Sequence, residues 1–240
     1  MTRSIWPLIL FVLSVACSDA GTTGPDLGMP TDSSSMDLPS HQFSMLGLVA
    51  GGLGGPGIAD GTGTAARFSF PYGVAADGTG NLFVADTMNH TIRKVVMITG
   101  VATTLAGTAG IYGSTDETGA AARFYRPNGV AADGAGNLFV ADGLNHTIRK
   151  VVVATGVVTT LAGTVGMSGG TDGTGAAARF NTPYGVAVDG AGNLFVADSS
   201  NHTVRKVVVA TGVVTTLAGT AGMSGSTDLP SKKWTGWLHA

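Results

Sequence analysis

Through the middle of the chain, short runs of apolar and β-branched residues alternate with clusters of glycine, aspartate, asparagine and threonine. In one stretch the runs are Tyr72–Ala76, Asn81–Asp86, Thr91–Met97 and Val101–Leu105. No window keeps apolar residues at the i, i+3, i+4, i+7 spacing of an amphipathic helix. We therefore expect four short strands joined by hairpin-length turns, that is, a small antiparallel sheet.

This four-strand pattern is written three times. Pro71, Pro127 and Pro183 open the copies, and successive copies are 56 residues apart. A fixed period of this kind is the signature of a repeat architecture. Four-stranded sheets repeated in series are typical of β-propeller blades, so the predicted fold class is all-β. The best helical candidate, Gly119–Phe124 (GAAARF), is expected to make about one turn between blades.

The segments VADTMNHTIRKV, VADGLNHTIRKV and VADSSNHTVRKV resemble NHL repeats, with Asn-His-Thr where the family usually has Asn-His-Leu. The resemblance covers roughly residues 45–226. It implies blades of the kind found in six-bladed propellers. It implies a fold more than a function, because this fold serves binding modules and enzymes alike.

Within residues 45–226 we expect three full blades, at about 68–123, 124–179 and 180–226. The stretch before them aligns with the tail of a repeat, so Leu46–Ala50 is predicted to be a lone strand of the outermost type. In this family such a strand would complete the last blade. Closed propellers have about four to eight blades. The chain is therefore a fragment, half of a three-plus-three ring of two chains, or an open arc that is marginal or self-associating.

Residues 1–17 are predicted to be an export signal rather than part of the fold. Arg3 gives a positive start, Ile5–Val15 is too short an apolar run to span a bilayer, and Leu13–Cys17 is similar to a bacterial lipobox. Cys17 is the only cysteine, so we expect it to carry a lipid. By the enteric rule, Ser18 would then direct the protein to the outer membrane. An ordinary secretory signal with an incidental cysteine is the alternative.

Two further segments have a composition unlike the repeats. Residues 18–44 are rich in Gly, Ser, Thr, Pro and Asp and are predicted to be a flexible tether. After Asp228 the repeat stops, and residues 227–240 form a divergent tail. Its Lys232, Lys233, Trp234 and Trp237 could anchor the chain to a membrane or glycan. We prefer a shifted reading frame or a truncated gene as the explanation of the tail, because the break is abrupt and falls within the repeated motif.

The charge of the chain argues against nucleic-acid binding. It has 13 Lys and Arg against 15 Asp and Glu, so it lacks the bulk positive charge of such surfaces. Each copy carries one Arg-Lys pair, as at Arg149-Lys150, which we interpret as solvated strand charges that discourage edge pairing. An exported protein would also not meet RNA.

One histidine per copy suggests a metal site: His90, His146 and His202. Three histidines are a known ligand set for Zn²⁺. Each, however, follows Asn in the same turn and has an aspartate nearby. We therefore expect each to form hydrogen bonds to the backbone of its own blade's turn, and we predict no metal and no cofactor.

An enzyme of this fold, the peptidyl-hydroxyglycine lyase of peptide amidation, is similar to the chain in architecture. Its zinc histidines follow the proline that opens a blade, and the matching residues here are Tyr72, Asn128 and Tyr184. None is a histidine, so the resemblance does not carry the metal centre over. Glu117 is the only glutamate, and no G-x-S-x-G nucleophile elbow is present.

The aspartates at the start of the D-G-x-G segments, Asp77, Asp133 and Asp189, are interpreted as turn formers. A Ca²⁺-loop interpretation lacks the alternating oxygen ligands and the distal glutamate of an EF-hand.

Positions at which the copies differ are free to build a surface, since loops on a rigid scaffold often bind ligands. They lie before the blade-opening proline and in the Asp-x-x-Asn-His turn; neutral drift is the alternative. From these positions we take Arg126, Met88 and Leu144, and we add the residues that follow the opening proline, Tyr72, Asn128 and Tyr184, as the predicted ligand face.

Together these features predict an exported, membrane-tethered, non-catalytic binding or scaffold module for an envelope protein, peptide or glycan. It would meet the membrane only through its lipid anchor, and a homodimer could complete a six-bladed ring. The alternatives are a metal-dependent propeller enzyme of the lyase or lactonase type, and a truncated product without independent function.

Overall fold

The computed structural model describes residues 47–52 and 54–225. All of its strands lie in the unit that begins at Val49. The predicted export signal with Cys17, the tether at 18–44 and the divergent tail at 227–240 lie outside the described residues and stay predictions. Among the described residues no helix is long and apolar enough to cross a membrane.

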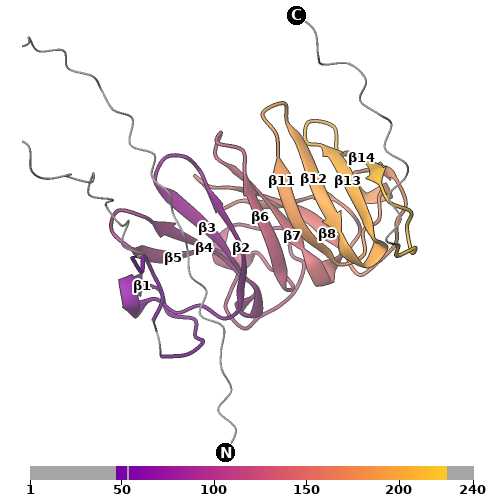
Figure 1. Cartoon of the computed structure of the whole chain (residues 1–240). Helices are drawn as coiled ribbons and strands as arrows, with labels where there is room; N and C mark the ends of the chain where they lie inside the picture. Colours follow the sequence, from indigo (N-terminus) through magenta and orange to yellow (C-terminus); the bar gives the residue numbers. More distant parts are fainter. Residues whose placement is uncertain (1–46, 53, 226–240) are drawn as a thin grey trace, which may run out of the picture. The chain divides into compact units, whose positions relative to one another are not determined.

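Three antiparallel sheets follow one another along the chain (Figure 1). The first, blade 1, contains β1 (Gly61–Thr62), β2 (Pro71–Ala76), β3 (Asn81–Asp86), β4 (Thr91–Val96) and β5 (Val101–Ala106). Blade 2 contains β6 (Pro127–Ala132), β7 (Asn137–Asp142), β8 (Thr147–Val152) and β9 (Val158–Ala162). Blade 3 contains β10 (Gly173–Thr174), β11 (Pro183–Val188), β12 (Asn193–Asp198), β13 (Thr203–Val208) and β14 (Val213–Ala218). The all-β prediction is confirmed.

Short 3₁₀ turns connect these strands at equivalent places in each copy. They are η1 (Gly63–Ala65), η2 (Thr87–Asn89), η3 (Gly119–Ala121), η4 (Gly143–Asn145), η5 (Gly175–Ala177) and η6 (Ser199–Asn201). The single turn expected in GAAARF is therefore present. The D-G-x-G turns also form as expected: Asp133 Oδ1 accepts hydrogen bonds from the backbone of Ala135 and Asn137 at 2.8 and 2.9 Å.

The apolar core lies between blades rather than within one of them. In β7, Leu138 and Val140 pack toward blade 1, whereas Phe139 and Ala141 pack toward blade 3. Alternate residues of a strand point to opposite faces of the sheet, so a strand covered on both faces has an almost continuous apolar sequence. In blade 2 the run NLFVAD is covered on both faces, which is the environment that its apolar sequence suits.

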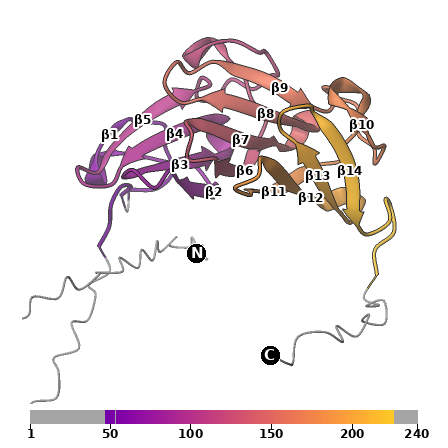
Figure 2. The same ribbon diagram turned by 90° about the horizontal axis from the view of Figure 1, so that it is seen from above.

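The strand that begins each blade lies on the inner side, where β2, β6 and β11 pack side by side (Figure 2). The backbones come close there: a Cβ added to Gly73 would lie 2.5 Å from the Asn128 carbonyl oxygen, and one added to Gly129 would collide with the Tyr184 carbonyl oxygen. Only glycine allows this approach. The repeated Pro-x-Gly-Val sequence thus sets the spacing between blades.

The expectation that the Arg-Lys pairs are solvated is wrong for the arginines. Arg149 is completely buried: its Nη1 donates to Asp142 Oδ2 at 2.8 Å and its Nη2 to Asp116 Oδ1 at 2.5 Å. Its guanidinium also lies 5.3 Å from the centre of the Phe124 ring. Blades 1 and 3 repeat this arrangement around Arg93 and Arg205. The arginine ties the connector to the sheet, and only the neighbouring lysine is partly exposed.

The lone N-terminal strand is not where it was expected. Residues 47–50 form no strand, and the strand that precedes blade 1 is β1, whose Gly61 and Thr62 pair with Ala102 and Val101 of β5. Val49 and Ala50 nevertheless pack on the free face of blade 1.

Three blades leave the ring open. Within the described part of the chain, one face of blade 1 and one face of blade 3 have no neighbouring blade. The open ring agrees with the prediction from the number of copies.

Candidate functional site

The loops whose sequences differ between copies meet at one end of each blade. In blade 1 the Met88 amide donates to the Ser69 carbonyl at 3.1 Å, and in blade 2 the Leu144 amide donates to the Tyr125 carbonyl at 3.0 Å. The segment before the opening proline and the turn before the histidine therefore lie side by side. Because loops held by a rigid sheet can vary in side chain, this end is a candidate binding face.

Each of the first two histidines connects this end of its blade to the next blade. His90 Nδ1 accepts a hydrogen bond from the Arg126 amide at 3.2 Å, and His146 Nδ1 accepts one from the Thr182 amide at 3.1 Å. The expected bond to the backbone is present, but the partner is the following blade and not the histidine's own turn. His202 has no such partner in the described part of the chain.

Both ends of these bonds have strained backbones. The histidines have φ near 60°, and Arg126 and Thr182 have φ of 51° and 50°. Non-glycine residues in the left-handed region cost free energy and persist where surrounding structure holds them, often at functional sites. The strained residues stand at or beside the positions where the copies differ, which adds weight to this face as a site.

An aromatic cluster lies at the junction of blades 1 and 2. The rings of Tyr112 and Tyr125 stack with centroids 4.5 Å apart, and the His90 ring packs edge-on against them at 5.8 and 5.7 Å. Tyr112 is 62% exposed, Tyr125 is half-buried and Arg126 beside them is exposed. We call His90, Tyr112, Tyr125 and Arg126 the aromatic cluster. It presents flat apolar surface next to a cation.

The surroundings of the His90 imidazole disfavour its protonated form. Burial lowers the pKa of His90, and the nearby charge of Arg126 lowers it further. A neutral ring is required, because Nδ1 accepts the hydrogen bond from the Arg126 amide. The exposed positive charge of the cluster is therefore that of Arg126 alone.

A second group of residues lies near the inner strands. The Tyr72 and Tyr184 rings are 5.8 Å apart although they come from the first and third blades. Burial, and then the neighbouring Tyr72, raises the pKa of Tyr184. Asn128, on the strand between them, is 6% exposed and its Nδ2 donates to the Pro183 carbonyl at 3.3 Å. The two tyrosines offer surface to a ligand, whereas the Asn128 side chain holds the blades together.

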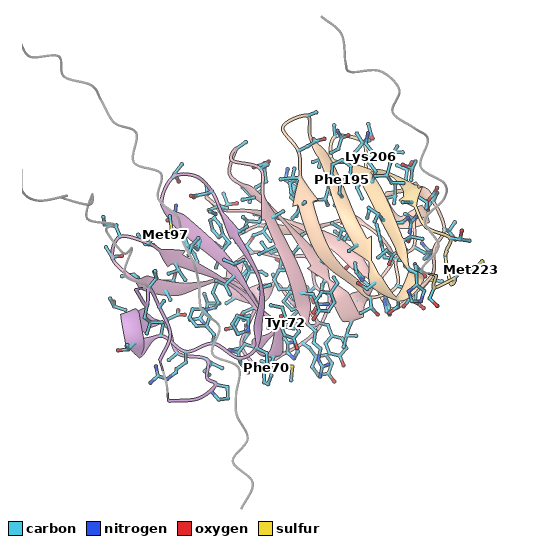
Figure 3. All side chains as sticks on the ribbon, viewed as in Figure 1. Phe70, Tyr72, Met97, Phe195, Lys206 and Met223 are labelled. Carbon is cyan, nitrogen blue, oxygen red and sulfur yellow. The ribbon has the colours of Figure 1, made fainter. Side chains whose placement is uncertain are left out.

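The other predicted residues belong to the same loops. Met88 is 41% exposed and Leu144 is half-buried; Phe70, which lies in the loop before Pro71, is 38% exposed. Figure 3 shows Phe70 and Tyr72 together at one edge of blade 1. Tyr112 is the residue that the sequence analysis missed. Ser168 and Ser224 stand at its equivalent positions, so the same comparison of copies would have identified it.

The histidines do not assemble into a metal site. Within the described ranges, no three side chains of His, Cys, Asp or Glu are placed so that they could hold a metal ion. The aspartate near each histidine is instead occupied by the buried arginine, as Asp86 is by Arg93 at 3.0 Å.

In comparison with known proteins, three segments of the chain match the NHL repeat family: residues 68–95, 124–151 and 180–207. NHL repeat-containing protein 2 from Homo sapiens is 34% identical over 163 residues, which cover 63% of this chain and 22% of that protein. Protein SUPPRESSOR OF QUENCHING 1, chloroplastic, from Arabidopsis thaliana is 34% identical over 132 residues, which cover 52% of this chain and 12% of that protein. The chain thus spans about a fifth or less of these curated relatives.

Solved structures support the same fold. An auxiliary nutrient binding protein from Bacteroides thetaiotaomicron aligns with a TM-score of 0.50 and 22% identity, over 60% of this chain and 38% of that one. The segments that match the family coincide with the repeated strands and turns described above. The chain therefore contains three NHL repeats, which fold as successive blades of an open β-propeller.

Proposed function

We propose that the chain is an exported, non-catalytic binding module that takes its ligand at the aromatic cluster. The observation that carries the proposal is the exposed stack of Tyr112 and Tyr125 beside Arg126. Aromatic residues and arginine are the side chains that most often dominate binding energy at interfaces. Export and the lipid anchor at Cys17 rest on the leader-like sequence, which lies outside the described residues.

The chemistry of the cluster narrows the ligand. Stacked rings favour a flat apolar face, such as a sugar ring or a peptide side chain. A guanidinium favours an acceptor that it can contact through two N–H groups, such as a carboxylate. A glycan or peptide of the cell envelope that carries an acidic group next to an apolar face meets both conditions.

The lack of an equivalent cluster at the next junction supports a specific role. At the junction of blades 2 and 3, Ser168, Asn181 and Thr182 stand where Tyr112, Tyr125 and Arg126 stand at the first junction. The hydrogen bond from the next blade to the histidine is the same at both. The aromatic side chains are therefore not needed to join blades.

The experiment compares binding by matched variants. The full chain is applied to arrays of acidic and neutral oligosaccharides and peptides, next to Tyr112→Ala, Tyr125→Ala and the control variants Ser168→Ala and Asn181→Ala. We expect a set of acidic ligands whose binding falls at least about ten-fold in the tyrosine variants, consistent with an energetic hot spot, and persists in the controls. Binding that all four variants retain would overturn the proposal.

A metal-dependent enzyme is the competing function, and metal analysis separates the two. Purified full chain is dialysed and its Zn²⁺ and Ca²⁺ are measured per chain. Our proposal expects no stoichiometric metal. A metal bound at one ion per chain and lost on replacing His90, His146 or His202 would favour the enzyme.

A further inference from the structure

The face of blade 3 that points away from blade 2 has the same pattern as a face that is fully covered. Phe139 and Ile148 of blade 2 are 0% exposed beneath blade 3. Their counterparts in blade 3, Phe195 and Val204, are respectively half-buried and 40% exposed. Leu217 beside them is 59% exposed. We call Phe195, Val204, Leu217 and the adjacent Ala218 the open face. It is an apolar blade interface without a neighbour among the described residues.

Gly185, on the inner strand β11 of blade 3, indicates what the side of blade 3 away from blade 2 would contact. Gly73 and Gly129 are required because the inner strand of the next blade passes too close for a Cβ. Gly185 stands at the same position in blade 3, but a Cβ there would meet only the Ala197 Cβ, at 3.6 Å. The backbone at Gly185 is not in the left-handed region either. Its glycine has no use within the described part of one chain, and would be needed if another inner strand packed against it.

The opposite end of the array, the free face of blade 1, is held by a short segment of the chain itself. Val49 and Ala50 pack against this face, and the Gly51 amide donates to the Gly63 carbonyl at 2.9 Å. The same bond joins Gly107 to Gly119 at 3.0 Å and Gly163 to Gly175 at 3.1 Å. In those cases the donor follows the outer strand of the preceding blade. Residues 49–51 therefore imitate the end of an outer strand.

The imitation extends to backbone conformation. Gly51 has φ of 106°, and Gly107, Gly163 and Gly219 have φ of 93°, 93° and 86°. Gly219 follows β14 in blade 3, where no described residue accepts a bond from it in the way that Gly119 accepts one from Gly107. The backbone of Gly219 thus has a conformation close to that of Gly51, and Ala218 precedes it as Ala50 precedes Gly51.

We propose that two copies of this chain associate head to tail, with the open face of blade 3 in one copy packed on the free face of blade 1 in the other. In the complex, Ala218 and Gly219 of one copy take the place of Ala50 and Gly51 in the other. The contact is heterologous, and two of them related by a two-fold axis close a ring. Three blades from each chain make six, within the range of closed propellers.

The segment at residues 49–51 then acts as an internal competitor. Among the described residues, one backbone hydrogen bond and two half-buried side chains hold it in place. The open face brings instead Phe195, Val204 and Leu217 on strands already fixed by their own sheet. The arriving blade buries more apolar surface than the segment does, so displacement is favourable while the docked segment weakens the apparent affinity.

The experiment measures the molar mass of the full chain against concentration by analytical ultracentrifugation, in a density-matched detergent that shields the apolar stretch near residue 10. We expect a reversible equilibrium between one and two chains. A single chain at every concentration, or assemblies that grow beyond two chains, would overturn the proposal.

Gly185→Ala tests the interface without a folding penalty. Its new methyl group would make only an ordinary contact within one chain, but would collide with the Tyr72 carbonyl oxygen of a second copy, as the corresponding change at Gly129 would with Tyr184. We expect this variant to stay folded and monomeric. Gly190→Ala is the matched control, because a Cβ at Gly190 meets nothing within 4 Å. Dimers of Gly185→Ala as tight as those of the control would contradict the proposed docking.

Val49→Asp tests the competitor. The charge weakens docking of the segment on its own blade 1, and Val49 takes no part in the proposed interface. If the segment is docked about nine-tenths of the time, its loss lowers the apparent dissociation constant about ten-fold. Ile98→Asp, at a site that is 94% exposed, controls for the added charge. Weaker dimers of Val49→Asp than of Ile98→Asp would show that the segment belongs to the interface and would overturn its role as competitor.

Discussion

Blades 2 and 3 have nearly the same sequence, but the face of blade 2 that meets blade 3 is buried and the equivalent face of blade 3 is partly exposed. Phe139 and Ile148 are completely buried beneath blade 3, whereas Phe195 and Val204 of blade 3 are partly exposed. His146 accepts a bond from the following blade, and His202 has no equivalent partner among the described residues. The sequence of a repeat therefore specifies a surface that fits another blade, and this surface is buried only where another blade packs against it. Variants at paired positions can test how far this holds.

The largest difference is expected at the paired phenylalanines. Phe139→Ala empties a site in a close-packed interface and should lower the free energy of unfolding by about 3–5 kcal/mol. Phe195→Ala removes a side chain that is already partly in water, so its loss should be under about 1 kcal/mol while the chain is monomeric. Urea unfolding at low protein concentration measures both. Equal losses would mean that blade 3 is covered in solution even at that concentration.

The buried arginines allow a comparison within a single strand. Arg149→Ala leaves Asp142 buried without its cation and should cost about 3–5 kcal/mol, at the lower end if water enters the space. Lys150→Ala, one residue along and partly exposed, should cost less than about 1 kcal/mol. Thermal or urea unfolding of the two variants provides the measurement. If the lysine variant lost as much stability as the arginine variant, the ion pair to Asp142 would not be what stabilises the blade.

The paired glycines should differ by a smaller amount. Gly129→Ala forces a methyl group against the Tyr184 carbonyl and is expected to destabilise the chain by about 1–3 kcal/mol. Gly185→Ala should leave the monomer unchanged or stabilise it by up to about 1 kcal/mol, since alanine restricts the unfolded chain. The midpoints of urea unfolding decide the matter. A strongly destabilised Gly185→Ala monomer would indicate that a neighbour already lies against this face.

The smallest expected effect is a pH dependence at the histidine bonds. Burial lowers the pKa of His90 and of His146 below the ordinary value of 6.5, with Arg126 adding to the effect at His90 and Asp198 opposing it at His146. Between each lowered pKa and 6.5 the unfolded chain binds more protons, so stability rises with pH there. The stabilisation is complete above pH 6.5 and is lost as pH falls through that window.

His146→Gln checks this assignment, because an amide oxygen can accept the bond at any pH in the window. The difference in unfolding free energy between about pH 7.5 and pH 5 should be smaller in this variant than in the parent chain. His202→Gln, at the position without a following blade, should leave that difference unchanged. An equal effect of the two substitutions would assign the pH dependence to the turn itself rather than to the contact between blades.

Much of the fold could be predicted from the sequence because the same pattern of strands and turns occurs in three copies. The strands expected at Asn81–Asp86 and Thr91–Met97 agree with β3 and β4 to within one residue. Turn chemistry was equally local: the Asp133 carboxylate bonds to amides only two and four residues away. Features that a segment of a few residues can decide were therefore accessible from the sequence.

The candidate site was only partly accessible. Variation between copies identified Arg126 and the two inner tyrosines, but Tyr112 was missed and its stacking on Tyr125 could not be foreseen, because these residues meet only when the connector folds back on the blade. The burial of Arg149 could not be predicted from the sequence for a similar reason. Its partner Asp116 is 33 residues away, and an arginine next to a lysine resembles any exposed charged pair in sequence.

The amino-acid sequence alone established the all-β class, the number of blades and the position of nearly every strand, because period, alternation and turn residues are local properties. Tertiary structure decided which apolar face is core, which blade each histidine serves and where residues 49–51 lie. These features depend on contacts between blades. Equivalent surfaces have almost the same sequence in each copy, so the sequence of one copy does not show which surface has a neighbour and which remains exposed.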